Sequence, residues 1–336
     1  MSKVGILGAG SWGTALAHLL YTNGHQVTVW SIDEREIEML NTEHEHRDKL
    51  PGVSLPEEMN FTTDLPSAVK EKELVILAVP SPYIRDTARK ASAFVAPGQI
   101  LVNVAKGIEA SSLMTMTQVI EQEIPAADVA VLSGPSHAEE VGRELPTTVV
   151  VGARTEQTAD FVRDHFMNDV FRVYTNPDVL GIEIGAALKN VIALAAGIAD
   201  GLGCGDNAKA ALITRGVTEM TRLGVAIGGR SETFFGLTGI GDLIVTCESR
   251  HSRNRHAGML IGQGKTAAEA MDEVKMVVEG VHSAKAAKAL SEKYQVPMPI
   301  VEQVNEVLFE NKKAKDALRE LMHRDRKTEH SEIAWK

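Results

Sequence analysis

The sequence predicts an α/β protein in which a doubly wound, mostly parallel sheet of the Rossmann type is followed by an all-helical domain. Short β-branched runs alternate with helical patterns from residue 4 to about residue 175. After Asn176-Pro177 the strand-like runs stop and only helical patterns follow. A chain of 336 residues also exceeds the roughly 250–300 residues at which a single core stops growing. We therefore expect two domains, residues 1–178 and residues 179–336.

The expected strands are short apolar runs separated by helical patterns, as in βαβ units. They are Val4–Leu7, Gln26–Trp30, Leu74–Val79, Ile100–Val104, Val129–Leu132, Thr148–Val151 and Phe171–Tyr174. The expected C-terminal helices are Val179–Asp200, Ala208–Leu223, Asn254–Ile261, Ala267–Val274, His282–Tyr294 and Ile300–Phe309. Residues 324–336 mix both charge signs with few apolar positions, so we expect them to form a frayed tail.

The composition excludes several classes of protein. A formal net charge of −10 argues against a nucleic-acid-binding protein, which needs a basic surface for phosphate contacts. The two cysteines, Cys204 and Cys247, form no CxxC pair, so we expect neither a disulfide scaffold nor a zinc site. An apolar run follows Lys3 at once and leaves no room for a secretion signal, so a cytoplasmic location is expected.

One stretch, Ile182–Ile198, is apolar enough to raise the question of a membrane span. Glu183, Lys189 and Asn190 interrupt it, so it falls short of the ~18 uncharged residues that a span needs. We expect a buried core helix instead.

A glycine-rich loop follows the first expected strand. Gly8, Gly10 and Gly13 form a GxGxxG pattern directly before an expected helix. Such glycines let the backbone approach a pyrophosphate, and the helix N-terminus offers free N–H groups and the positive end of its dipole. The pattern predicts a dinucleotide site, with Ser11 and Trp12 beneath the pyrophosphate. The alternative is that these two side chains only cap the helix and pack the loop.

Asp33 follows the second expected strand, 20 residues after Gly13, at the spacing of an acid that binds the ribose. It could equally cap a helix that begins at Glu34. Ser31 and Arg35 could accommodate a 2′-phosphate. The sequence therefore predicts NAD or NADP as the cofactor and leaves the choice between them open.

Two further segments should face the cofactor crevice, because ligands bind outside the carboxyl ends of parallel strands. The expected strand Ile100–Val104 leads to Lys106, a candidate cation, and Val129–Leu132 leads to Ser133-Gly-Pro-Ser-His-Ala138. A solvated loop lysine is the alternative for Lys106.

Lys189 is the only charge between Glu183 and Asp200 on the most apolar expected helix. Small residues share its face, so it should be desolvated. Burial lowers a lysine pKa and makes the side chain usable as a general acid or base near neutral pH. The alternative is a structural lysine paired with Asp242, which an expected tight glycine loop presents.

Ser252, Arg253 and Asn254 lie at the start of an expected helix. A hydroxyl cap, a guanidinium and free helix N–H groups suit a phosphate. A basic surface run is the alternative.

Eight ordered motifs resemble those of bacterial NAD(P)-dependent glycerol-3-phosphate dehydrogenases, over residues 4 to 325. They are Gly8–Leu16, Ala105–Glu109, Ser133–Ser136, Lys189–Val191, Asn207–Gly216, Gly239–Leu243, Ser252–Arg255 and Val278–Gly280. The resemblance implies reversible reduction of dihydroxyacetone phosphate to sn-glycerol 3-phosphate, which supplies glycerophospholipid synthesis. It also implies a homodimer.

The resemblance assigns residues by position. Lys189 matches the proton donor/acceptor of the family. Cofactor contacts match Ser11, Trp12, Lys106, Ala138, Arg253, Val277 and Glu279, and substrate contacts match Lys106, Gly134, Ser136, Lys189, Asp242, Ser252, Arg253 and Asn254. The sequence departs from many members in having Ile32, rather than a basic residue, after Ser31, which puts NADP preference in doubt.

Two other functions compete with this one. A β-hydroxyacid dehydrogenase of the same architecture would bind a carboxylate where Ser252–Arg255 is expected to bind a phosphate. A cofactor-sensing regulator would bind the dinucleotide without turnover, which the presence of Lys106, Lys189 and Asp242 argues against. His44-Glu-His46 is spaced like half a metal site, but we expect a solvated helix end and no metal.

Overall fold

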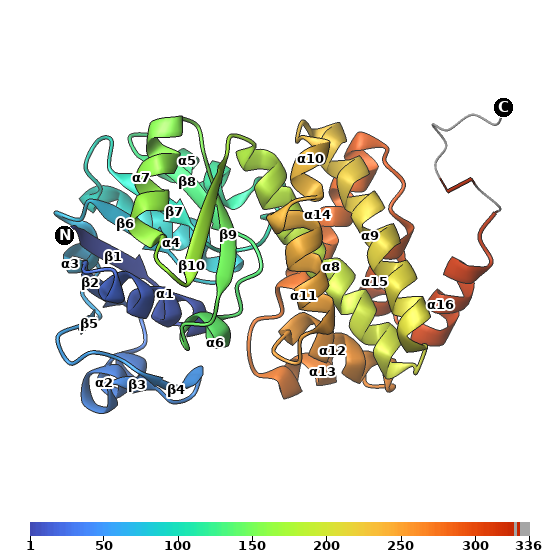
Figure 1. Ribbon diagram of the computed structural model, residues 1–336. Helices are drawn as coiled ribbons and strands as arrows, with labels where there is room; N and C mark the ends of the chain where they lie inside the picture. The colour runs from blue at the N-terminus through green and yellow to red at the C-terminus, as the bar shows by residue number, and fades with distance from the viewer. Residues whose placement is uncertain (326–327, 330–336) are drawn as a thin grey trace.

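The structure is a computed structural model that describes residues 1–325, 328 and 329. An α/β part holds the N-terminus, and a helical part lies beside it (Figure 1). The expected tail, residues 324–336, lies mostly outside the described residues.

The α/β part is built on one eight-stranded sheet. Its strands are β1 (Lys3–Leu7), β2 (Gln26–Trp30), β5 (Asn60–Thr62), β6 (Leu74–Leu77), β7 (Ile100–Asn103), β8 (Asp128–Ser133), β9 (Thr147–Ala153) and β10 (Phe171–Asn176). The strand order is β10-β9-β8-β7-β6-β1-β2-β5. All neighbouring pairs are parallel except β8 and β9, which are antiparallel. The predicted doubly wound sheet is confirmed, and its direction of winding changes between β1 and β6.

Helices cover both faces of this sheet. One face packs against α1 (Ser11–Thr22), α2 (Glu34–Glu43), α6 (Ala138–Val141) and α7 (Glu156–Phe166). The other packs against α3 (Leu65–Val69), α4 (Ile84–Ala91) and α5 (Met116–Glu123). Short 3-10 turns, η1 (Ser81–Tyr83) and η2 (Ser92–Phe94), flank α4. Because the carboxyl ends of β1, β6, β7 and β8 share one edge, the loops after them converge there.

Three strands were not predicted from the sequence. β5 has only three residues, and the hairpin β3 (Glu45–His46) and β4 (Leu50–Ser54) contains Pro51 and Gly52, which strands usually avoid. This hairpin corrects the expectation for His46, which is buried rather than solvated and lies 2.8 Å from Glu36 through its Nε2. Within the described residues, no three His, Cys, Asp or Glu side chains gather as a metal site would require.

The helical part is arranged around α8. Its helices are α8 (Val179–Gly201), α9 (Gly205–Ile227), α10 (Ser231–Phe234), the π-helical η3 (Leu237–Gly241), α11 (Asp242–Glu248), α12 (Arg253–Gly262), α13 (Ala267–Val274), α14 (Glu279–Tyr294), α15 (Pro299–Phe309) and α16 (Ala314–Met322). All six predicted helices are present. The expected tight loop before Asp242 is instead the π-helical turn η3, which leads directly into α11.

Helix α8 is long and apolar enough to cross a membrane. Contrary to the expectation from the sequence, Glu183, Lys189 and Asn190 therefore do not by themselves rule out a membrane span. The surroundings of α8 decide the question, because 89% of its most apolar window is buried inside the fold. The expectation of a core helix is therefore confirmed.

Close packing of α8 on α12 depends on glycines in both helices. A Cβ at Gly197 would lie 2.0 Å from the Arg255 carbonyl oxygen, and a Cβ at Gly258 would lie 2.1 Å from the Leu194 carbonyl oxygen. Since α12 begins at Arg253, this contact also sets where Ser252–Asn254 lies relative to Lys189.

We expect Gly258→Val to destabilise the protein by about 2–3 kcal/mol, because a side chain there forces the two backbones apart. The midpoint of thermal unfolding should fall by roughly 4–10 °C. An unchanged midpoint would show that the helices are not in backbone contact.

Candidate active site

The glycine-rich loop joins β1 to α1 and is shaped for close approach. A Cβ at Gly13 would lie 1.9 Å from the Gly8 carbonyl oxygen, and one at Gly8, where φ is +122°, would lie 2.8 Å from the Ala78 carbonyl carbon. A Cβ at Gly10 would meet no atom within 4 Å, so the space above the loop is open. Two glycines therefore tighten the turn, while the third keeps a cradle clear at the start of α1.

Trp12 adds a second sign of a ligand at this loop. Its Nε1 is buried and has no hydrogen-bond partner in the described residues. A buried N–H without a partner costs about 1–3 kcal/mol, so a ligand or water that accepts from it would remove that cost. The loop and this atom fit a dinucleotide, as the sequence predicts.

At the end of β2, Asp33 caps α2: its Oδ1 accepts from Arg35 N at 3.0 Å. This is the second of the two roles that the sequence left open. Ser31 is buried and donates from Oγ to Glu36 Oε2 at 2.5 Å. Burial would raise the pKa of Glu36, but hydrogen bonds from His46, Lys49 and Ser31 outweigh it and hold the pKa at about 2. The carboxylates of Asp33 and Glu36, at the end of β2, are therefore both engaged by neighbouring groups.

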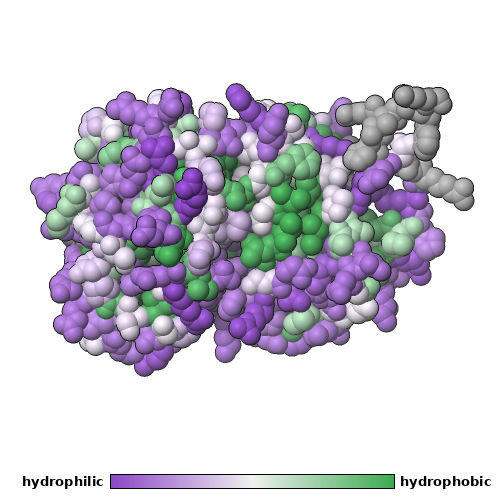
Figure 2. Space-filling view, viewed as in Figure 1, coloured by the Kyte–Doolittle hydropathy of each residue, from purple (hydrophilic) through white to green (hydrophobic). Residues whose placement is uncertain are grey.

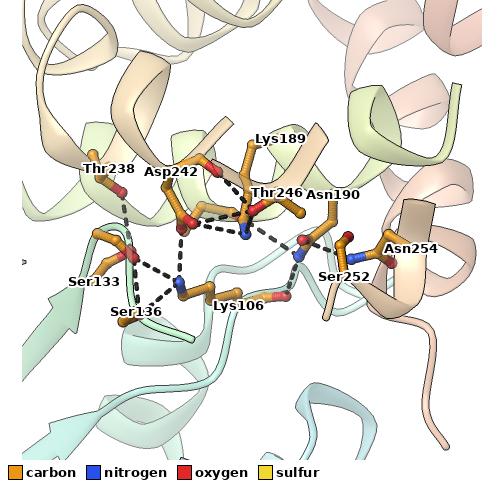
Figure 3. A network of polar contacts seen from close by, with 12 residues as sticks. Lys106, Ser133, Ser136, Lys189, Asn190, Thr238, Asp242, Thr246, Ser252 and Asn254 are labelled. Atoms are coloured by element: carbon orange, nitrogen blue, oxygen red, sulfur yellow. Dashed lines mark hydrogen bonds and ion pairs between the residues drawn. The ribbon is translucent and has the colours of Figure 1, made fainter. Parts of the chain in front are cut away.

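Lys189 and Asp242, which are buried, form a cluster with the half-buried Lys106 where the two parts of the protein meet (Figure 3). Asp242 Oδ1 accepts from Lys189 Nζ at 3.0 Å, and its Oδ2 accepts from Lys106 Nζ at 2.7 Å. Lys189 also donates to Thr246 Oγ1 at 2.7 Å. One carboxylate thus holds an ammonium from the helical part and another from the α/β part.

The charges of this cluster shift one another. Burial lowers the pKa of Lys189 to about 8, although Asp242 acts in the opposite direction. Burial alone would raise the pKa of Asp242, but Lys106 and Lys189 outweigh it and hold that pKa below its usual value. Two cations against one anion leave a net positive charge, which favours an anionic ligand.

The loop after β8 lies beside Lys106. The Gly134 carbonyl oxygen accepts from Lys106 Nζ at 3.0 Å, and the Ser136 hydroxyl lies 3.2 Å from the same nitrogen. Gly134 has φ +134°, a conformation that favours glycine. Ala138 is buried at the start of α6. The structure therefore brings Lys106, Gly134 and Ser136 together, as the sequence predicted for neighbouring strand ends.

At the start of α12, Ser252 is the N-cap, and its Oγ accepts from Arg255 N at 3.2 Å. Arg255 is paired with Asp200, whose Oδ2 lies 2.7 Å from Nε, whereas Arg253 is exposed. Asn254 is buried and donates to Asn190 Oδ1 at 2.9 Å, which leaves its second amide N–H for another acceptor. Arg253 is thus the arginine of this segment that is placed to meet a ligand.

Val277 and Glu279 lie at the start of α14, and Val277 is half-buried. Glu279 reaches the α/β part, where its carboxylate accepts from Ser81 N at 3.0 Å and from Ser81 Oγ at 2.5 Å. Because Ser81 lies on the loop after β6, Glu279 lies at the sheet edge where the loops after β1, β6, β7 and β8 converge.

Three residues of the site were not singled out from the sequence. Thr246 contacts Lys189, and its place four residues after Asp242 on α11 is a signal that helical spacing could have given. Asn190 joins the Lys106 and Asn254 segments, with its Nδ2 3.5 Å from the Lys106 carbonyl oxygen. Ser81 carries no sequence signal for its contact with Glu279.

A glycine loop at the switch point of a doubly wound sheet, in a chain that also holds a buried lysine whose pKa is lowered to about 8, defines a class of protein. It is a dehydrogenase that uses a nicotinamide dinucleotide, since reduction of a carbonyl requires both a hydride carrier and a proton donor. Comparison with known proteins specifies the class further.

Residues 3–159 match the model of the NAD-dependent glycerol-3-phosphate dehydrogenase N-terminus, and residues 178–319 match that of the C-terminus. The chain is 67% identical over 336 residues to the glycerol-3-phosphate dehydrogenase [NAD(P)+] of Agathobacter rectalis, covering 100% of both chains. It is 51% identical to that of Bacillus subtilis, covering 99% of this chain and 97% of the other.

Among solved structures, glycerol-3-phosphate dehydrogenase from Coxiella burnetii is similar, with a TM-score of 0.93 and 35% identity over 96% of this chain and 99% of that one. The chain belongs to the NAD-dependent glycerol-3-phosphate dehydrogenase family and is an NAD(P)-dependent oxidoreductase. The resemblance found from the motifs is confirmed, and the β-hydroxyacid dehydrogenase and regulator alternatives are rejected.

Proposed function

We propose that the protein catalyses the reversible NAD(P)H-dependent reduction of dihydroxyacetone phosphate to sn-glycerol 3-phosphate, with Lys189 as the proton donor and acceptor. The observation that carries this proposal is the buried Lys189 Nζ, 3.0 Å from Asp242 and with its pKa lowered to about 8. A lysine in this state gives up and takes back a proton near neutral pH.

During reduction, Lys189 protonates the oxygen that develops negative charge at substrate C2. In the reverse direction the neutral amine removes the proton from the C2 hydroxyl. Asp242 orients both ammonium groups, and Lys106 stabilises the developing charge as a second cation. The nicotinamide, when bound, supplies or accepts the hydride.

Binding is assigned to the residues around this cluster. Gly134 and Ser136 hold the substrate beside Lys106, while Ser252, Arg253 and Asn254 hold its phosphate at the start of α12. A dianion there meets a guanidinium and the positive end of a helix dipole.

The cofactor would be held by the α/β part and by the start of α14. The loop of Gly8, Gly10, Ser11, Trp12 and Gly13 would hold its pyrophosphate. The remaining contacts are assigned to Lys106, Ala138, Arg253, Val277 and Glu279. The open space at Gly10 and the partnerless Trp12 Nε1 support this assignment.

Oxidation of NADH and of NADPH, followed separately with dihydroxyacetone phosphate, tests the reaction and the cofactor choice together. We expect turnover with both cofactors. Asp33 caps α2, so it is not held in place for the ribose that distinguishes NAD, and no basic side chain directly follows Ser31 to favour NADP. A kcat/KM ratio between them beyond ~10³, about 4 kcal/mol, would refute dual use. Absence of turnover with either would refute the proposed reaction.

We also propose a division into residues 1–178, which bind the dinucleotide, and residues 179–336, which bind the substrate.

We further propose that the protein is a homodimer in the cytoplasm and that its product supplies glycerophospholipid synthesis. In Figure 2 an apolar area lies over the helical part, and Val225, Phe235 and Ile244 are exposed hydrophobic residues of this part. Burying such an area would favour association. Light scattering should give twice the mass of the chain, and the mass of one chain would contradict the dimer.

A further inference from the structure

Two buried glutamates outside the proposed mechanism lie on the long helices α8 and α9. Glu183 and Glu219 each have an exposed fraction of 3%. Each accepts a backbone N–H at the start of another helix: Glu183 from Thr117 N of α5 at 2.9 Å, and Glu219 from Ile300 N of α15 at 3.0 Å. Burial raises the pKa of both carboxyls. In this respect the two residues are a matched pair.

Glu183 differs from Glu219 in a further contact that leads to the active site. Its Oε1 accepts from Asn103 Nδ2 at 2.9 Å, and its Oε2 accepts from the Thr117 hydroxyl. Asn103 is the last residue of β7 and is fully buried. A residue of the helical part therefore holds the carboxyl end of a central strand.

Asn103 in turn fixes the segment that carries Lys106. Its Oδ1 accepts from Ala105 N at 3.0 Å, and its Nδ2 donates to the Ala105 carbonyl oxygen at 3.0 Å. Both peptide groups of Ala105 are thus held by one side chain, whose orientation is set by Glu183. The next residue is Lys106.

Glu183 lies on the same helix as Lys189, one to two turns before it. Helix α8 therefore places Lys189 directly and Lys106 through Glu183 and Asn103, and the two ammonium groups meet on Asp242 (Figure 3). We propose that Glu183 is a positioning residue that, through Asn103, sets the place of Lys106 relative to Lys189. This inference rests on the proposed role of Lys106.

Substitutions at Glu183 separate positioning from stability. Glu183→Leu keeps the approximate size but removes the acceptor, so Asn103 loses its anchor. Misplacement of a catalytic group by about 1 Å can cost 10²-fold, and we expect kcat/KM for dihydroxyacetone phosphate to fall roughly 10- to 100-fold. Glu183→Gln keeps an acceptor for Asn103 and Thr117 and should retain nearly full activity.

The matched control is Glu219→Leu, which removes an equally buried acceptor whose hydrogen bonds go to the start of α15 rather than to the end of β7. It should lower the unfolding temperature while leaving kcat/KM nearly unchanged in the folded enzyme. Asn103→Ala is the second variant, because it breaks the link to Ala105 and spares the Glu183 contacts with Thr117. It should lower kcat/KM as Glu183→Leu does, with the smaller loss of stability.

A double-mutant cycle with Lys106→Met decides whether the effect passes through Lys106. In the Lys106→Met enzyme, adding Glu183→Leu or Asn103→Ala should cause no further loss of kcat/KM. Losses that multiply, full activity of Glu183→Leu and Asn103→Ala, or an equal loss in Glu219→Leu would each overturn the inference. Full activity of Lys106→Met itself would contradict the proposed role of Lys106 and would overturn the inference about Glu183, which rests on that role.

Discussion

Lys189→Met is expected to lower kcat for dihydroxyacetone phosphate reduction by at least ~10²-fold, the lower end for removal of a general acid. Methionine matches the length and shape of the lysine stem but cannot carry a proton. Asp242 keeps Lys106 as a partner at 2.7 Å, so its charge is not left unpaired and the fold should survive. Initial rates at saturating NADH and substrate give the measurement.

Lys72→Met is the control for this substitution. Burial lowers the pKa of Lys72 as well, but Lys72 lies just before the amino end of β6, and its Nζ donates to Thr28 Oγ1 at 3.0 Å. It should retain normal kcat. Near-normal turnover of folded Lys189→Met would show that Lys189 is structural.

Arg253→Ala is expected to impair the phosphorylated substrate selectively. Loss of a charge-assisted contact costs ~2–4 kcal/mol, so kcat/KM for dihydroxyacetone phosphate should fall roughly 30- to 1000-fold. Unphosphorylated dihydroxyacetone lacks the contact and should lose far less. The assay needs saturating cofactor, because Arg253 is also assigned a cofactor contact.

The matched control is Arg250→Ala, which removes an exposed arginine three residues earlier and outside the start of α12. It should leave both substrates unaffected. Equal proportional losses for both substrates in Arg253→Ala would assign Arg253 to the cofactor or the fold.

Local patterns predicted the fold where they are strong. The apolar runs of β1, β2, β6, β7 and β8 and the amphipathic or apolar helices α8, α12 and α14 lie within a few residues of the expected positions. β5 and the β3–β4 hairpin could not be predicted, because three residues, or strands that contain proline and glycine, carry no clear alternation. The antiparallel direction of β9 depends on the path of the chain rather than on its own residues.

The same distinction holds at the site. Lys189 was recognisable because it is a single charge on an otherwise apolar helix, where a charge is costly to bury. Gly8, Gly10 and Gly13 were recognisable because they follow the GxGxxG spacing. The convergence of Lys106 and Lys189 on Asp242 was only half expected, since the sequence paired Asp242 with Lys189 alone. Contacts such as Glu183 with Asn103 join residues 80 positions apart and leave no local signal.

The pH dependence of kcat/KM in both directions tests the role of Lys189 most directly. Reduction needs the ammonium and oxidation needs the amine. Because the pKa of Lys189 is lowered to about 8, kcat/KM for reduction should be constant below pH 8 and fall tenfold per pH unit above it. For oxidation it should rise with pH and level off above pH 8. The range from about pH 7 to 10 avoids the second phosphate ionisation near pH 6.

We expect opposite pH dependences that share one inflection near pH 8, and we expect this inflection to be absent from the residual rates of Lys189→Met. An inflection that persists in Lys189→Met, or rates for reduction that stay constant to pH 10, would contradict the proposed role of Lys189 and place the proton donor elsewhere.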